Sequence, residues 1–166
     1  MYLFMISCYL MMVFNVMNLF ISVTMGIWNF SFLGSNHAQF SLFAILVFVL
    51  TETLVMYFFI ATGKSIKVIL TKQNTSDAIK LWEEIKYIKK LIFPQIMLTI
   101  SLIGGLYIFY FGYIISNSTD GSILRYTWVL LPLILISITQ HLWSLKIKND
   151  SFKMQIDIVS KISSDS

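Results

Sequence analysis

The chain has 166 residues, of which 57% are hydrophobic and only 12% charged, and its formal charge is +4. The mean hydropathy of +0.79 excludes an ordinary water-soluble enzyme domain. Four apolar runs of about 20 residues each match the length that an α-helix needs to cross a bilayer. Because a spanning helix satisfies its own backbone hydrogen bonds, we expect an all-α integral membrane protein built as a four-helix bundle.

The predicted spans follow one another with short polar joints. The first covers roughly residues 2–25 and lacks the basic start of a signal peptide, so we expect a retained helix. A tight turn at Gly34-Ser35-Asn36 leads to the second span, roughly residues 38–61. The third, roughly residues 93–115, opens at Pro94, which suits a first helical turn. A turn cluster at 116–124 precedes the fourth span, roughly residues 126–145. We expect a transmembrane domain over residues 1–148 and a polar C-terminal tail over 149–166.

The basic residues predict the orientation. Seven lysines lie between the second and third spans and four follow the fourth, whereas Arg125 is the one basic residue elsewhere. By the positive-inside rule, these two segments are cytoplasmic. Both termini are then also cytoplasmic, and the turns at 29–36 and 116–124 face the other side. The basic charge reflects this topology, so no nucleic-acid partner is expected.

Residues 76–92, between the second and third spans, have the pattern of an amphipathic helix. Apolar residues recur at spacings of three and four, while lysines and glutamates take the other face. We expect this helix to lie at the cytoplasmic headgroup level, against lipid or a partner subunit, before Pro94 turns the chain into the membrane. The residues expected to face lipid or a partner are Trp82, Ile85, Ile88, Lys86, Lys89 and Lys90.

Glu52, near the middle of the second span, is the strongest candidate for a functional residue, because charged groups at membrane depth are costly. Its carboxyl is expected to be protonated, hydrogen-bonded or paired with a cation. Three roles stay open: proton or ion transfer, metal ligation with a histidine, and hydrogen bonding between helices. Asn15, Asn18 and Gln140 are candidates for the same helix-packing or proton/ion site. Paired glycines at 104–105 predict close helix packing.

His37 and His141 are the candidate cofactor ligands. At a rise of about 1.5 Å per residue, the predicted topology puts them on opposite sides of the membrane, which excludes a bis-histidine haem within one chain. A haem shared with another subunit is an alternative to simple helix packing. The sequence has no phosphate-binding loop, HExxH or CxxC motif. We therefore predict no catalytic residue, no metal site, no cofactor and no enzyme activity.

The segment MYFFIATGKSIK, residues 56–67, resembles uncharacterised small bacterial four-helix integral membrane proteins. A proline that opens the third span, paired glycines within it and His141-Leu142 fit the same resemblance. It implies a bacterial inner membrane and association with a larger complex, and it brings no activity. It also implies histidine where this chain has Glu52, a departure that argues against a conventional haem site but leaves a metal or proton role open.

The sequence favours a non-catalytic accessory or structural subunit of a larger membrane complex, with a respiratory or redox complex as the first candidate. One alternative is a small haem- or metal-binding membrane protein that uses His141, His37 or Glu52 with a partner. Another is a proton or ion conductor centred on Glu52. The expected partners are the lipid bilayer and other membrane subunits. The expected location is a bacterial inner membrane, with an organellar inner membrane as the alternative.

Overall fold

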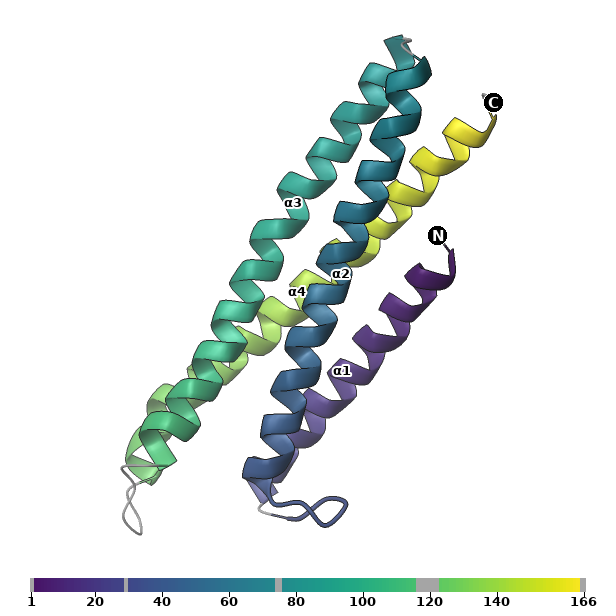
Figure 1. Ribbon diagram of the computed structural model, residues 1–166. Helices are drawn as coiled ribbons and strands as arrows, with labels where there is room; N and C mark the ends of the chain where they lie inside the picture. The colour runs from purple at the N-terminus through teal and green to yellow at the C-terminus, as the bar shows by residue number, and fades with distance from the viewer. Residues whose placement is uncertain (1, 29, 74–75, 116–122, 165–166) are drawn as a thin grey trace.

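The computed structural model of the chain consists of long helices that alternate in direction (Figure 1). It describes residues 2–28, 30–73, 76–115 and 123–164. In these ranges the elements are α1 (Tyr2–Trp28), α2 (His37–Gln73), α3 (Ser76–Tyr107), the π-helix η1 (Ile108–Ile115) and α4 (Ile123–Ser164). Four described helices are long and apolar enough to cross a membrane. The prediction of an all-helical chain with four such helices is confirmed, and the packing is consistent with a four-helix bundle.

The turn before α2 is tight and well capped. Two backbone hydrogen bonds close it around Leu33 and Gly34, whose φ angles are 51° and 75°. Two successive positive φ angles define a type I′ turn, in which glycine carries no Cβ penalty. Asn36 then begins the helix as a capping box: its Oδ1 accepts the Gln39 N–H, and Gln39 Oε1 accepts the Asn36 N–H. The second predicted turn, at 116–124, lies largely in residues 116–122, outside the described residues.

α2 is the central and most buried of the long helices. It packs against α1 and α3, while α4 packs against α3 and crosses behind α2 (Figure 1). The apolar interior is rich in aromatic side chains, and Phe58 and Phe59 of α2 both contact the ring of Phe152 on α4. The buried apolar residues between these helices include Cys8, Met12, Val55, Phe58, Phe59, Ile92, Ile96 and Phe152.

Three helices are much longer than the spans that the sequence predicts. α2 has 37 residues and α4 has 42, so they are about 55 and 63 Å long, against a hydrocarbon core of about 30 Å. Both continue, with α3, past the N-terminal end of α1 (Figure 1). We call this part, residues 62–73, 76–89 and 156–164, the extension. Its buried residues are Ile66, Leu70, Ala78, Leu81, Ile85, Ile88, Ile158 and Ile162.

The segment predicted to be a separate amphipathic helix is the first part of α3, which runs without a break through Pro94. Ile85 and Ile88 are buried in the chain's own core, whereas Ile79 is 63% exposed. The two buried side chains are therefore not available to lipid or to a partner. The physical reason is that α2 itself continues to Gln73 and gives this segment a helix to pack against.

The segment expected to be a polar tail also differs, because residues 149–164 continue α4. Phe152 and Ile158 are almost fully buried there. Apolar residues at helical spacing within a polar stretch are enough to hold it against α2 and α3.

The glycines have different surroundings. A Cβ placed on Gly26 of α1 would lie 2.9 Å from Cε1 of His37, so Gly26 leaves the space that this ring occupies. The ring of His37 also contacts the rings of Tyr110 and Phe111 in η1. Gly104 and Gly105, in contrast, have no described atom within 4 Å of such a Cβ. Their expected role in bringing helices of this chain together is therefore not seen.

This difference gives a matched pair of substitutions. We predict that Gly26→Ala destabilises the fold by about 1 kcal/mol, because the half-buried ring of His37 has to move away from the added methyl group. Gly104→Ala adds the same methyl group in open space and should be neutral or stabilising by up to about 1 kcal/mol, because alanine is the better helix former. Thermal unfolding of both variants in mild detergent, followed by circular dichroism, measures the effect. Equal midpoints would contradict the close contact between Gly26 and His37.

Candidate functional site

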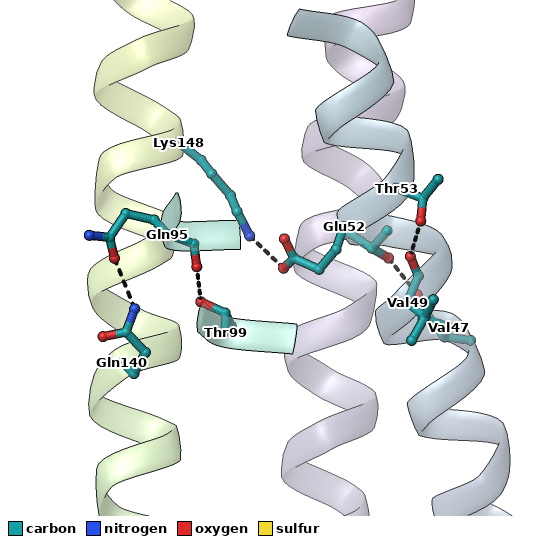
Figure 2. Close-up of polar contacts among 9 residues, drawn as sticks. Val47, Val49, Glu52, Thr53, Gln95, Thr99, Gln140 and Lys148 are labelled. Atoms are coloured by element: carbon teal, nitrogen blue, oxygen red, sulfur yellow. Dashed lines mark hydrogen bonds and ion pairs between the residues drawn. The ribbon is translucent and has the colours of Figure 1, made fainter. Parts of the chain in front are cut away.

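Glu52 of α2 and Lys148 of α4 form a buried ion pair (Figure 2). Lys148 Nζ donates to Glu52 Oε1 at 2.5 Å, and each side chain is only 1% exposed. An isolated charge in a low-dielectric interior costs several kcal/mol, so each group makes the burial of the other tolerable. The expectation that Glu52 is hydrogen-bonded or paired with a cation is met by a residue that lies 96 positions along the chain.

Lys148 has a different environment from the one that its sequence position suggests. The sequence places it among the lysines that follow the fourth span, where it counts toward the orientation. In the structure its side chain turns inward, whereas Lys146, Lys153 and Lys161 are exposed. Since Lys148 is neutralised by Glu52, the predicted orientation depends on the other lysines.

Lys148 belongs to a row of polar side chains along one face of α4. Successive members are alternately four and three residues apart, the spacing of a seam that packs against neighbouring helices. Leu130 before the row and Ile158 after it continue the spacing and are buried. We call this set the polar row; its members, all buried, are Ser137, His141, Ser144, Lys148, Ser151 and Gln155.

Many polar atoms in this interior have no hydrogen-bond partner among the described residues. In native proteins most buried polar atoms are bonded to protein or to ordered water, so such a concentration is unusual. The unpartnered atoms are both ring nitrogens of His141, the hydroxyl oxygens of Ser144 and Ser151, Gln155 Oε1, Glu52 Oε2 and both side-chain amide atoms of Asn15.

The other predicted polar residues have separate environments. Gln140 Nε2 donates to Gln95 Oε1 at 2.9 Å and links α4 to α3 beside the ion pair (Figure 2). Asn18 Nδ2 donates to the carbonyl of Phe14 in its own helix. The structure thus brings Glu52 together with Lys148, and Gln140 with Gln95. A hydrogen bond between membrane helices, such as the one between Gln140 and Gln95, contributes about 0.6 kcal/mol on average.

The two histidines do not meet. His37 is the first residue of α2, whereas the ring of His141 lies 5.9 Å from the ring of Phe48. His37 and Phe48 are separated along α2 by about 16 Å. The rings cannot both ligate one haem or metal ion in a single chain, as the sequence predicts. Within the part of the chain that the structure describes, no group of three or more His, Cys, Asp or Glu residues could hold a metal ion.

Residues expected to face lipid or a partner lie partly on the surface of the extension. Trp82 is half-buried, and the ammonium groups of Lys67 and Lys86 lie 5.4 and 5.8 Å from its ring centroid. Lys86 also pairs with an exposed glutamate of its own helix at 2.7 Å. Lys89 is half-buried and Lys90 is exposed. Exposed pairs of this kind contribute little to stability, so this surface is free to respond to a charged neighbour.

Lys148, Ser151 and Gln155 are site residues that the sequence patterns do not predict. A lysine just after an apolar run is usually a topology signal, and the two polar residues fall in a segment that looks like a tail. The signal that identifies them is the spacing of polar residues, alternately four and three positions, which starts at Ser137 and continues unchanged to Gln155.

Comparison with known proteins finds no family model, no curated protein and no solved structure that matches this chain. The candidate site is therefore defined by its geometry alone.

The ion pair predicts a double-mutant cycle with a large coupling. Glu52→Leu or Lys148→Met alone should destabilise the protein by about 3–5 kcal/mol, because each leaves a buried charge without its partner. The double variant should be close to the wild type, since two apolar side chains of similar size replace the pair. Chemical or thermal unfolding in detergent measures the cycle. Additive losses would show that the two side chains do not interact.

Proposed function

We propose that the chain is a non-catalytic accessory subunit of a larger membrane complex, with a respiratory or redox complex as the first candidate. Both termini lie on the cytoplasmic side of a bacterial inner membrane in this proposal. The observation that carries it is an exposed face of small residues on α3, at Ser101 and Gly105, to which no described helix of the chain packs closely.

Small residues four positions apart are the usual means by which membrane helices approach one another closely. Ser101 and Gly105 have this spacing, and both are exposed. The flanking residues Met97 and Ile108 are exposed as well, so an apolar strip surrounds the small residues. A helix of another subunit fits such a strip, because close packing is the main source of affinity between helices in lipid.

The extension supports the same proposal. Its three helices share a buried core, so it is a rigid, charged surface rather than a loose connection. By the positive-inside rule, its lysines favour a cytoplasmic location for the extension. Exposed side chains such as Lys80, Lys86 and Lys90 would there meet either anionic headgroups or a cytoplasmic subunit.

The alternative of a haem or metal protein has less support from the geometry. His37 and His141 lie apart, so each would need further ligands from a partner subunit. An absorption spectrum of the native purified protein distinguishes this alternative from the accessory subunit.

The exposed face gives a direct test. Native purification in mild detergent should recover the wild type with larger subunits, and Gly105→Leu should lose them, because the added side chain blocks close approach. Thr53→Leu is the matched control: it adds a leucine at another exposed position of the membrane region and should leave the assembly intact. Mass spectrometry identifies what co-migrates.

Two outcomes would contradict the proposal. One is a wild type that purifies alone. The other is a homo-oligomer of this chain that Gly105→Leu dissociates, which would locate an interface but remove the role of accessory subunit.

A further inference from the structure

The polar row of α4 needs partners that the described protein atoms do not supply. His141, Ser144, Ser151 and Gln155 are all at least nine-tenths buried, and each has at least one polar atom without a hydrogen bond. Buried polar groups in this situation usually bind ordered water. Four such side chains on one helix face would together need several waters rather than one.

The spacing of the row suits a line of waters. Side chains three or four residues apart on a helix have Cβ atoms about 5–6 Å apart. A water molecule that makes two hydrogen bonds of about 2.8 Å bridges nearly this distance. One water between successive members would therefore connect the row from His141 to Gln155, about 21 Å along α4.

The ion pair lies in the middle of this line. Lys148 is itself a member of the row, and Glu52 has one carboxylate oxygen bonded to Lys148 and the other unpartnered. Imidazole, carboxyl, amine, hydroxyl and water can each accept and release a proton. The row with its waters would then be a continuous series of proton donors and acceptors.

Contacts between α1 and α2 show which residues lie at the same level. Gly26 is beside His37, and the hydroxyls of Ser22 and Ser41 are 2.7 Å apart. In both contacts the two residue numbers sum to 63, so this sum relates antiparallel neighbours on the two helices.

The same relation places Asn15 at the level of Phe48, whose ring contacts the ring of His141. Asn15 is buried, and both of its amide atoms are unpartnered. Asn18 and Ser22 follow at helical spacing toward the His37 end of the bundle. A second polar series, on α1, therefore begins at the level where His141 lies on α4.

We propose that these two series and the water between them form a proton path through the bundle. The path runs from the His37 end along Ser22, Asn18 and Asn15 to His141, and then along the polar row past the ion pair to Gln155. Each half comes from a different helix, and the halves meet one turn from Glu52.

The ion pair provides the transfer step. A proton that arrives through water at Glu52 Oε2 converts the carboxylate to the acid. Lys148, no longer facing a negative charge, releases one proton to the water at Ser151. The carboxyl group of Glu52 then rotates so that its protonated oxygen faces Lys148 Nζ, and it transfers the proton to the neutral amine. This transfer restores the ion pair. One proton enters and one leaves in each cycle, and no other reactant is consumed.

The test measures proton movement into liposomes that contain the purified full chain. Valinomycin lets potassium leave potassium-loaded liposomes, and the resulting inside-negative potential drives protons inward. An internal pH-sensitive dye reports the rate of proton entry. The wild type should acidify the interior faster than protein-free liposomes. Glu52→Gln should reduce the protein-dependent rate by roughly 10²-fold or more, because it removes a positioned proton-transfer group.

Because Glu52→Gln also disturbs the ion pair, a second variant separates transport from folding. Ser151→Ala removes only a hydroxyl group from the row and should slow proton movement while helix content and thermal midpoint stay unchanged. Thr139→Val is the matched control, since it removes an exposed hydroxyl of α4 that bonds to its own helix. It should conduct like the wild type.

Two results would overturn the proposal. One is a wild-type rate equal to that of protein-free liposomes. The other is an unchanged rate in folded Glu52→Gln and Ser151→Ala proteins. Neither result bears on the accessory-subunit proposal, which is decided by co-purification.

Discussion

An ionised carboxylate or ammonium is costly to bury, so Glu52 and Lys148 can lie in the interior only while α2 and α4 hold them together. This requirement fixes the position of α4 on α2. Once it is met, the same face of α4 brings His141 against Phe48 and Phe152 against Phe58. It also brings the hydroxyls and amides of the polar row into the core. The contact between Glu52 and Lys148 thus both stabilises the two buried charges and turns the polar face of α4 toward the interior.

The contrast between the polar interior and the apolar surface follows from the same arrangement. Polar side chains are gathered inside, and large apolar side chains such as Leu3, Phe20 and Leu135 are exposed. In water such a surface would drive aggregation, whereas in lipid it is matched by the acyl chains. The small residues Ser101 and Gly105 interrupt this apolar surface at one place, which is why that place is a specific candidate for a partner helix.

Sequence patterns correctly predict four helices long and apolar enough to span a membrane, because apolar length is a local property. They also identified Glu52 as a residue that needs a partner. They do not identify Lys148 as that partner, because the pairing depends on how α2 and α4 are aligned, and the two residues are 96 positions apart in the sequence. The helical segments after Ala61 and before Phe93 are not predicted for a similar reason: beyond the apolar runs, contacts with neighbouring helices rather than hydropathy stabilise the helix. The glycine pair at 104–105 shows that a packing motif does not specify which chain will pack on it.

The unbroken course of α2, α3 and α4 has a mechanical consequence. Helices of this length change tilt to match the thickness of the bilayer around them. Because the extension continues these helices without a hinge in the described residues, it must move with them. For a rigid rod of about 20 Å, a change in tilt of about 10° displaces the tip by about 3–4 Å. The end of the extension would thus report membrane thickness to anything bound there.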